Sequence, residues 1–194
     1  MQHLFFQTFI LISLIAVTAS QAVAQGSGKS FELKGRSLGQ SPELACQGSP
    51  LTDHQELVIS AGIPGMDYPA ASCEVQVLSV ADVVVQKPAH LLFWKGQLTR
   101  IVIRFGVIDL EPLAQLRGTL VQGFGKSVVR TSKPFRSEVW SRGLEQLQLE
   151  RTEGMPSDVD LFLTHTSRMS EYKKSRARVE AAIAGLSEFS CSRR

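Results

Sequence analysis

An uncharged apolar run from Leu4 to Val17 is the feature that most restricts what this chain can fold into. Ala22-Val23-Ala24 follows it and places small residues at the two positions that a signal peptidase reads. The run is shorter than the about 20 apolar residues of a membrane-spanning helix. We therefore predict a secretory signal peptide over residues 1–24 and an exported protein, periplasmic or, as the alternative, extracellular. An uncleaved anchor stays open, because no Lys or Arg precedes the run.

The rest of the chain is predicted to form one domain. Residues 25–30 read as a flexible Gly/Ser leader, residues 31–189 as the domain and residues 190–194 as a frayed tail. The apolar and charged fractions of the chain, 43% and 20%, are those of an ordinary globular protein. The formal net charge of +3 is mild. Strong nucleic-acid binders concentrate a basic face, so we do not expect nucleic acid as a partner.

The three cysteines predict one disulfide in an oxidising compartment. Cys46 and Cys73 flank a single turn-rich segment, so they are the expected pair. Cys191 is left over near the end of the chain. It is either a tolerated free thiol or the site of an intermolecular disulfide.

The pattern of apolar residues predicts short strands interspersed with three helices. The helices are expected to begin at Ser41, Asp109 and Ser170. This order of elements predicts the α+β class, with an antiparallel sheet and helices packed on it in two layers. The expected strands cover residues 31–34, 74–85 (with a break near 81–82), 90–94, 97–105, 136–140, 144–151 and 158–166.

A two-residue turn at Lys95-Gly96 predicts a hairpin in which alternate side chains share a face. The predicted core face carries Leu92, Trp94, Ile101, Ile103 and Phe105. The other face mixes apolar and cationic side chains, and Arg and aromatic residues are favoured anchors in interfaces. We therefore select it as the candidate binding surface, formed by Leu91, Phe93, Arg100, Val102 and Arg104.

A basic cluster on the last predicted helix is a candidate anion-binding face. Alternatively, it is a solvated helix surface, with Glu171 pairing with Lys174 and Arg176 with Glu180. The cluster consists of Arg168, Lys173, Lys174, Arg176 and Arg178.

Two Gly-Lys-Ser triplets, at residues 28–30 and 125–127, resemble part of a phosphate-binding loop. Such a loop needs a further glycine five positions earlier, where this chain has Val23 and Leu120. We therefore assign the triplets no nucleotide and expect no cofactor.

The histidines give little support to a metal site or to catalysis. His54, His90 and His165 are far apart in the sequence and lie near no Cys-x-x-Cys motif. The chain also lacks the Gly-x-Ser-x-Gly elbow of many hydrolases. We assign no catalytic or metal-binding residue. A small hydrolase stays the alternative, and it requires one of these histidines to meet a Ser or a carboxylate in a pocket.

Three short motifs within residues 31–166 resemble uncharacterised small exported proteins of proteobacteria. Less closely, they are similar to β-lactamase-inhibitor proteins and to small outer-membrane assembly lipoproteins, whose lipidated cysteine this chain lacks. The resemblance transfers no functional residue and implies a non-enzymatic binding or assembly module. The expected partner is another envelope protein, with anionic lipid or glycan as the alternative. The motifs are Gly35-Arg36-Ser37-Leu38-Gly39, Trp94-Lys95-Gly96-Gln97-Leu98 and Gly123-Phe124-Gly125-Lys126.

Overall fold

The computed structural model describes residues 30–60, 66–154 and 156–191. The predicted signal peptide and its cleavage site lie outside the described residues, as do nearly all of the leader and the last three residues of the predicted tail. The side chain of Cys191 is likewise outside them.

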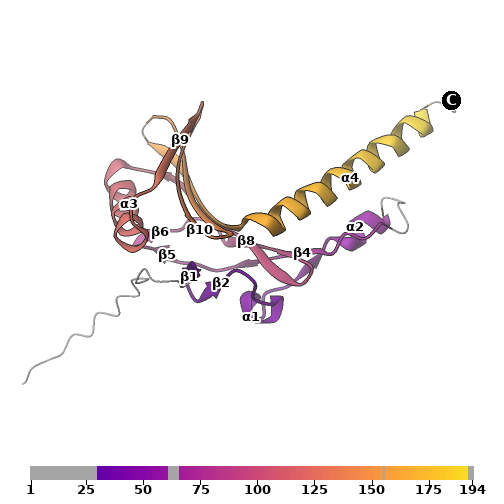
Figure 1. Ribbon diagram of the computed structural model, residues 1–194, viewed down its shortest axis with the longest axis horizontal. Coiled ribbons are helices and arrows are strands. Elements are labelled where there is room, and N and C mark those ends of the chain that lie inside the picture. The colour runs from indigo at the N-terminus through magenta and orange to yellow at the C-terminus, as the bar shows by residue number, and fades with distance from the viewer. Residues whose placement is uncertain (1–29, 61–65, 155, 192–194) are drawn as a thin grey trace, which may run out of the picture.

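An eight-stranded sheet in which all neighbouring strands are antiparallel forms the centre of the molecule (Figure 1). The predicted α+β class and antiparallel sheet are therefore confirmed. In spatial order the strands are β3 (Thr52–Asp53), β4 (Ala70–Val75), β7 (Ala89–Trp94), β8 (Gln97–Ile108), β12 (Ser157–His165), β11 (Glu145–Thr152), β10 (Phe135–Arg142) and β9 (Val128–Ser132).

Four helices and two small hairpins surround this sheet. The hairpins are β1 (Glu32–Leu33) with β2 (Arg36–Ser37) and β5 (Ser79–Val80) with β6 (Val83–Val84). The helices are α1 (Pro42–Cys46), α2 (Gln55–Ser60), α3 (Leu110–Phe124) and α4 (Thr166–Cys191). None of the helices in the described part of the chain has the length and apolar character needed to cross a membrane.

One side of the sheet, which we call the inner face, carries the main hydrophobic core. Leu113, Leu116 and Leu120 recur every three or four residues, as a buried helix stripe requires, and through them α3 packs on this face. The helix begins at the predicted Asp109 and ends at Gly125. The helix α1 and both small hairpins contribute to the same core. Sheet and covering elements thus form the two predicted layers.

The opposite side, the outer face, is covered at one end by α4 and α2. Met169, Tyr172 and Val179 of α4 share a second hydrophobic cluster with Val58 of α2 and Trp94 of β7. Tyr172, Tyr68 and Trp94 contact one another, with ring centroids 5.9 to 6.0 Å apart. From this cluster α4 rises away from the sheet (Figure 1), so none of the four described helices covers the remainder of the outer face.

The β7–β8 hairpin has the predicted turn but not the predicted register. Lys95 and Gly96 both adopt positive φ, 52° and 70°, as a tight turn of this kind requires. A two-residue turn at Lys95-Gly96 predicts that Phe93 faces Leu98 and that Leu91 faces Arg100. Phe93 does face Leu98, but Leu92 faces Arg100. The extra residue between the two pairings is the fully buried Thr99, which forms a β-bulge.

This bulge overturns part of the predicted binding surface. Leu91 and Phe93 lie on the inner face and have no solvent exposure, whereas Leu92 and Trp94 lie on the outer face. Arg100, Val102 and Arg104 keep their place on the outer face, because the bulge precedes them. An insertion of one residue exchanges the two faces of a strand relative to its partner, which explains the error.

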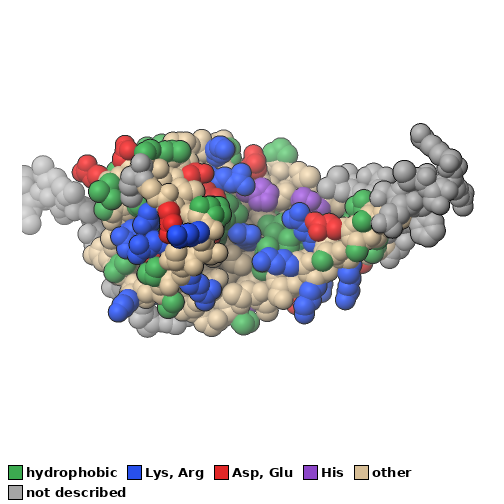
Figure 2. Space-filling model, turned by 90° about the horizontal axis from the view of Figure 1, so that it is seen from above, with side chains coloured by type: hydrophobic (Ala, Val, Ile, Leu, Met, Phe, Trp, Pro, Cys, Tyr) green, Lys and Arg blue, Asp and Glu red, His purple; other side chains and the backbone are tan. Residues whose placement is uncertain are grey.

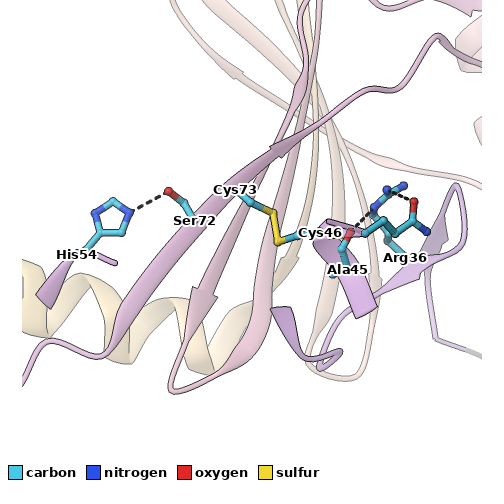
Figure 3. The surroundings of a disulfide bond; sticks show 7 residues. Arg36, Ala45, Cys46, His54, Ser72 and Cys73 are labelled. Carbon is cyan, nitrogen blue, oxygen red and sulfur yellow. Dashed lines mark hydrogen bonds between the residues drawn. A yellow bond between two sulfur atoms is a disulfide. The ribbon is translucent and has the colours of Figure 1, made fainter. Parts of the chain in front are cut away.

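The predicted disulfide between Cys46 and Cys73 is present and ties α1 to β4 (Figure 3). Beside it, the buried Arg36 donates from Nε to the carbonyl of Ala45 at 2.8 Å and from Nη2 to Oε1 of Gln47 at 2.9 Å. These bonds satisfy acceptors at the end of α1. The N-terminal hairpin, α1 and the sheet are therefore joined by one covalent bond and several hydrogen bonds.

Candidate functional site

The uncovered part of the outer face is the candidate site, and it is built from rows of directly paired residues on neighbouring strands. Figure 2 looks down on the side from which α4 rises and shows acidic, basic, histidine and hydrophobic side chains interleaved there. Side chains at alternate positions of each strand point to this face. Its central residues are His90, Arg100, Val102, Arg104, Gln148, Glu150, Asp160 and Phe162.

Arg100 is the best-defined group of this face. Its guanidinium carbon lies 4.5 Å from the centre of the Phe162 ring, a cation–π contact between β8 and β12. The Nε atom of Arg100 is buried and has no hydrogen-bond partner. Burial lowers the pKa of Arg100, against the opposing influence of Glu150 and Asp160. The guanidinium is therefore held in place by stacking, while its buried Nε has no acceptor among the described residues.

A row of charged residues crosses the strands beside this stack. Arg104 faces Asp160, Asp160 faces Glu150, and Glu150 faces Ser137. Oε2 of Glu150 accepts hydrogen bonds from Nε2 of Gln148 at 2.9 Å and from Oγ of Ser137 at 3.2 Å. Cationic groups therefore occupy the β8 side of the outer face, and carboxylates occupy the β11 and β12 side.

Asp160 should contribute a loss of stability at neutral pH that is absent in acid. Burial, followed by the charge of Asp158, raises the pKa of Asp160 above its ordinary value of 3.8. The folded state thus binds the proton more tightly, and stability falls as pH rises from 3.8 through the raised pKa.

We expect Asp160→Asn to raise Tm at pH 7 and to leave it unchanged at a pH well below 3.8, where the carboxyl is protonated in both states. Thermal unfolding of both proteins across this pH range measures the effect. Asp67→Asn, which removes an exposed carboxyl before β4, is the control. An Asp160→Asn variant that is less stable than the wild type at pH 7 would contradict the expectation.

Two histidines meet serines, as the hydrolase alternative requires. Nε2 of His54 lies 2.9 Å from Oγ of Ser72 (Figure 3), and Nδ1 of His165 lies 3.3 Å from Oγ of Ser167. Ser72 and Cys73, as consecutive strand residues, point to opposite sides of β4 in this view. Within the described residues neither pair is joined by a carboxylate in hydrogen-bond contact with the histidine, so neither has the third member that orients a catalytic base.

The alternation of residues 158–166 in the sequence predicts that His165 shares the core face of Val159, Leu161 and Leu163. Val159, Leu161 and Leu163 do lie in the core, but His165 is half-buried at the end of β12. His90 faces Glu74 on one side and Val102 on the other, and burial lowers its pKa. Among the described residues, no three His, Cys, Asp or Glu side chains are arranged to hold a metal ion.

The basic residues of α4 are brought together only in part. Arg176 pairs with Glu180 as expected, with Nε and Oε1 2.7 Å apart. Glu171 accepts instead from Lys95, at 3.2 Å, and from the Trp94 indole, so the expected pair with Lys174 does not form. Lys173, Lys174, Arg176 and Arg178 are exposed, whereas Arg168 is half-buried near the sheet. This arrangement favours the solvated-surface interpretation.

A cavity of about 240 Å³ lies away from all of the predicted site residues. The guanidinium of Arg142 lies 4.8 Å from the ring centre of Phe31 and 5.4 Å from that of Phe124 in its wall. The Trp140 indole beside it donates to the carbonyl of Gly125. The Arg142 guanidinium and the Trp140 indole of this cavity are thus already engaged by groups of the protein itself. We therefore do not select the cavity as the functional site.

The sequence prediction missed the β11 and β12 half of the outer face. Phe162 is an aromatic residue at an alternating position otherwise occupied by polar side chains, opposite to Leu161 and Leu163. That signal was readable in the sequence, because one aromatic among Asp160 and Thr164 is unexpected on a purely solvated face. Its pairing with Arg100 depends on the order of the strands, which the sequence pattern does not specify.

Comparisons with protein-family models, with curated proteins and with solved structures find no match to this chain. The resemblance to small exported proteobacterial proteins and to outer-membrane assembly lipoproteins therefore stays a prediction from short motifs.

Proposed function

We propose that this protein is an exported binding module that holds another envelope protein on its outer face. The observation that carries the proposal is Arg100, which is stacked on Phe162 with a buried and unbonded Nε. Arginine and aromatic side chains at the centre of a rigid surface are typical anchors of protein interfaces. Because stacking already orders this guanidinium, a partner would lose little side-chain entropy in binding it.

The distribution of charge favours a protein over a polyanion. Arg104 on β8 faces Asp160 on β12, which in turn faces Glu150 on β11, and Arg100 lies on the same surface. An anionic lipid surface or glycan would be repelled by these carboxylates, whereas a protein can present groups of both signs in a complementary pattern. The presence of both signs on one surface therefore supports a protein partner with acidic and basic groups at matching positions.

The oxidised pair Cys46–Cys73 supports export, because disulfides persist in oxidising compartments. The pair is buried, as expected for a structural bond. Export to the cell envelope and binding of an envelope protein are therefore both parts of what we propose.

Photo-crosslinking in intact cells can test the outer face. A photoreactive amino acid in place of the exposed Ser141, which lies in the row of Arg100, should trap the partner. The same substitution at Lys34, in the turn of the β1–β2 hairpin on the inner-face side, should not. Mass spectrometry then identifies the attached protein, and its purified form is used for measurement of Kd.

We expect Arg104→Glu to raise the Kd for that protein by about tenfold or more, because the variant reverses a charge beside the Arg100 anchor. Lys34→Glu makes the same change of charge on the opposite side and should leave Kd unchanged. Isothermal titration calorimetry with both variants gives the comparison. Equal affinities for the two variants, or crosslinks of equal yield from Lys34 and Ser141, would overturn the proposal.

A further inference from the structure

A second pair of arginines lies on the inner face, toward the β9 edge of the sheet. Arg136 of β10 and Arg151 of β11 face each other directly in the β10–β11 pairing. Both occupy inner-face positions, two residues along their strands from Glu138 and Leu149. Two like charges at directly opposed positions repel each other, so the sheet alone gives no reason for this pairing.

Neither arginine has a counter-ion among the described residues. Within the described residues, no hydrogen bond or ion pair involves the side chain of Arg136 or of Arg151. Both residues are half-buried, and Nε of Arg136 is buried without any acceptor. A buried donor that lacks an acceptor is costly, which makes an unfilled pair of guanidinium groups unusual.

The neighbouring carboxylate is already engaged. Glu138 is buried and pairs through Oε1 with Nε of Arg117 from α3. Its Oε2 accepts from Oγ of Ser127 at 3.2 Å. Glu138 therefore neutralises Arg117, and within the described residues it accepts no hydrogen bond from Arg136 or Arg151.

The row is accessible from the edge of the sheet. Thr131 of β9 faces Arg136 on its other side, is exposed and occupies the same face. A ligand that approaches from the β9 edge would contact the Thr131 hydroxyl first, then the guanidinium of Arg136 and then that of Arg151. Each guanidinium offers several N–H donors in a fixed planar arrangement, suited to the oxygens of an anion.

We propose that Arg136 and Arg151, with Thr131 at the entrance, form a binding site for a phosphate group. A phosphate dianion carries two charges and several acceptor oxygens, which match two guanidinium groups and a hydroxyl. A carboxylate would neutralise only one of the two arginines. The phosphate is either a free ion or a phosphomonoester headgroup at a membrane surface. This site lies on the face opposite to the proposed protein-binding surface and does not depend on it.

Inorganic phosphate is the first probe, with the whole exported protein. Its addition should raise Tm, whereas chloride or acetate at equal ionic strength should not. Arg136→Gln and Arg151→Gln should each weaken phosphate binding by about tenfold, the loss of one charge-assisted hydrogen bond. Arg130→Gln is the matched control, since Arg130 is an exposed arginine of β9 whose side chain occupies the other face, opposite Ser137.

The variants also have an expected effect without phosphate. Because each removes one of two like charges, Arg136→Gln and Arg151→Gln should have a higher Tm than the wild type in phosphate-free buffer. Circular dichroism verifies that each variant is folded, and Arg151→Lys replaces any glutamine variant that is not. The lysine variant retains the charge but loses the planar set of donors, so its phosphate affinity should also fall.

Vesicles separate the two sources of phosphate. Binding to vesicles containing phosphatidic acid, but not to pure phosphatidylcholine, that Arg151→Gln abolishes would identify a lipid headgroup. A response to inorganic phosphate alone would identify a free ion. The proposal is overturned if neither probe binds, if acetate acts as well as phosphate, or if Arg130→Gln weakens binding as much as Arg151→Gln.

Discussion

Replacing Phe93 by alanine should lower the free energy of unfolding by about 3 to 5 kcal/mol, the usual cost of removing a fully buried phenylalanine. The Phe93 side chain has no solvent exposure and belongs to the main core on the inner face. The core cluster that contains Phe93 is built from several strands and from α1, so its side chains are unable to close the resulting cavity completely. Urea denaturation followed by circular dichroism measures the change.

Phe162→Ala is the matched control, because Phe162 lies on the outer face and is only half-buried. Its replacement removes the contact with Arg100 and should cost about 1 to 2 kcal/mol. The two variants remove the same atoms from opposite sides of the sheet. Equal costs, or a larger cost for Phe162→Ala, would contradict the assignment of Phe93 to the core.

Removing the disulfide should have an effect of similar size. The bond joins residues 27 positions apart, and closing such a loop restricts the unfolded chain by about 3.5 kcal/mol in the simple entropy model. Both cysteines are buried, so alanine fits in their places without exposing a polar atom. We therefore expect Cys46→Ala/Cys73→Ala to unfold at a lower urea concentration, with a free energy of unfolding reduced by about that amount.

The control for this experiment is Cys191→Ser, which keeps the Cys46–Cys73 bond and should keep wild-type stability. Reduction of the wild type with dithiothreitol should reproduce the instability of the double variant. Wild-type stability in the double variant would show that other contacts of α1, such as the hydrogen bonds of Arg36, hold it on the sheet without the bond.

Local signals in the sequence predicted much of the fold. The Lys95-Gly96 turn, the stripe of leucines on α3 and the alternation of Val159, Leu161 and Leu163 each depend on a few neighbouring residues. The cysteine pair could be predicted because the choice among three cysteines was small. The strand β9 was missed, since its five side chains are all exposed and give no alternation of burial for a pattern to show.

The candidate site was harder to predict, because one buried residue decides which side chains of the β7–β8 hairpin point to the outer face. Thr99 forms the bulge that moves Leu91 to the position opposite Ile101 instead of Arg100. The threonine resembles an ordinary strand residue in sequence, and its extra position is visible only when both strands are aligned. The Arg100–Phe162 stack and the Arg136–Arg151 pair depend in the same way on which strands become neighbours.

The open ends of the sheet have a consequence for how copies of this protein meet. The strand at one edge, β3, has two residues, whereas β9 at the other has five and carries Val128 and Val129 at 62% and 48% exposure. Such an edge invites pairing with another strand and, through it, aggregation. Arg130 occupies the centre of β9. Two copies that pair through β9 in antiparallel register about Arg130 would bring their two Arg130 side chains directly opposite each other. The repulsion between these like charges opposes pairing of β9 with the β9 strand of a second copy.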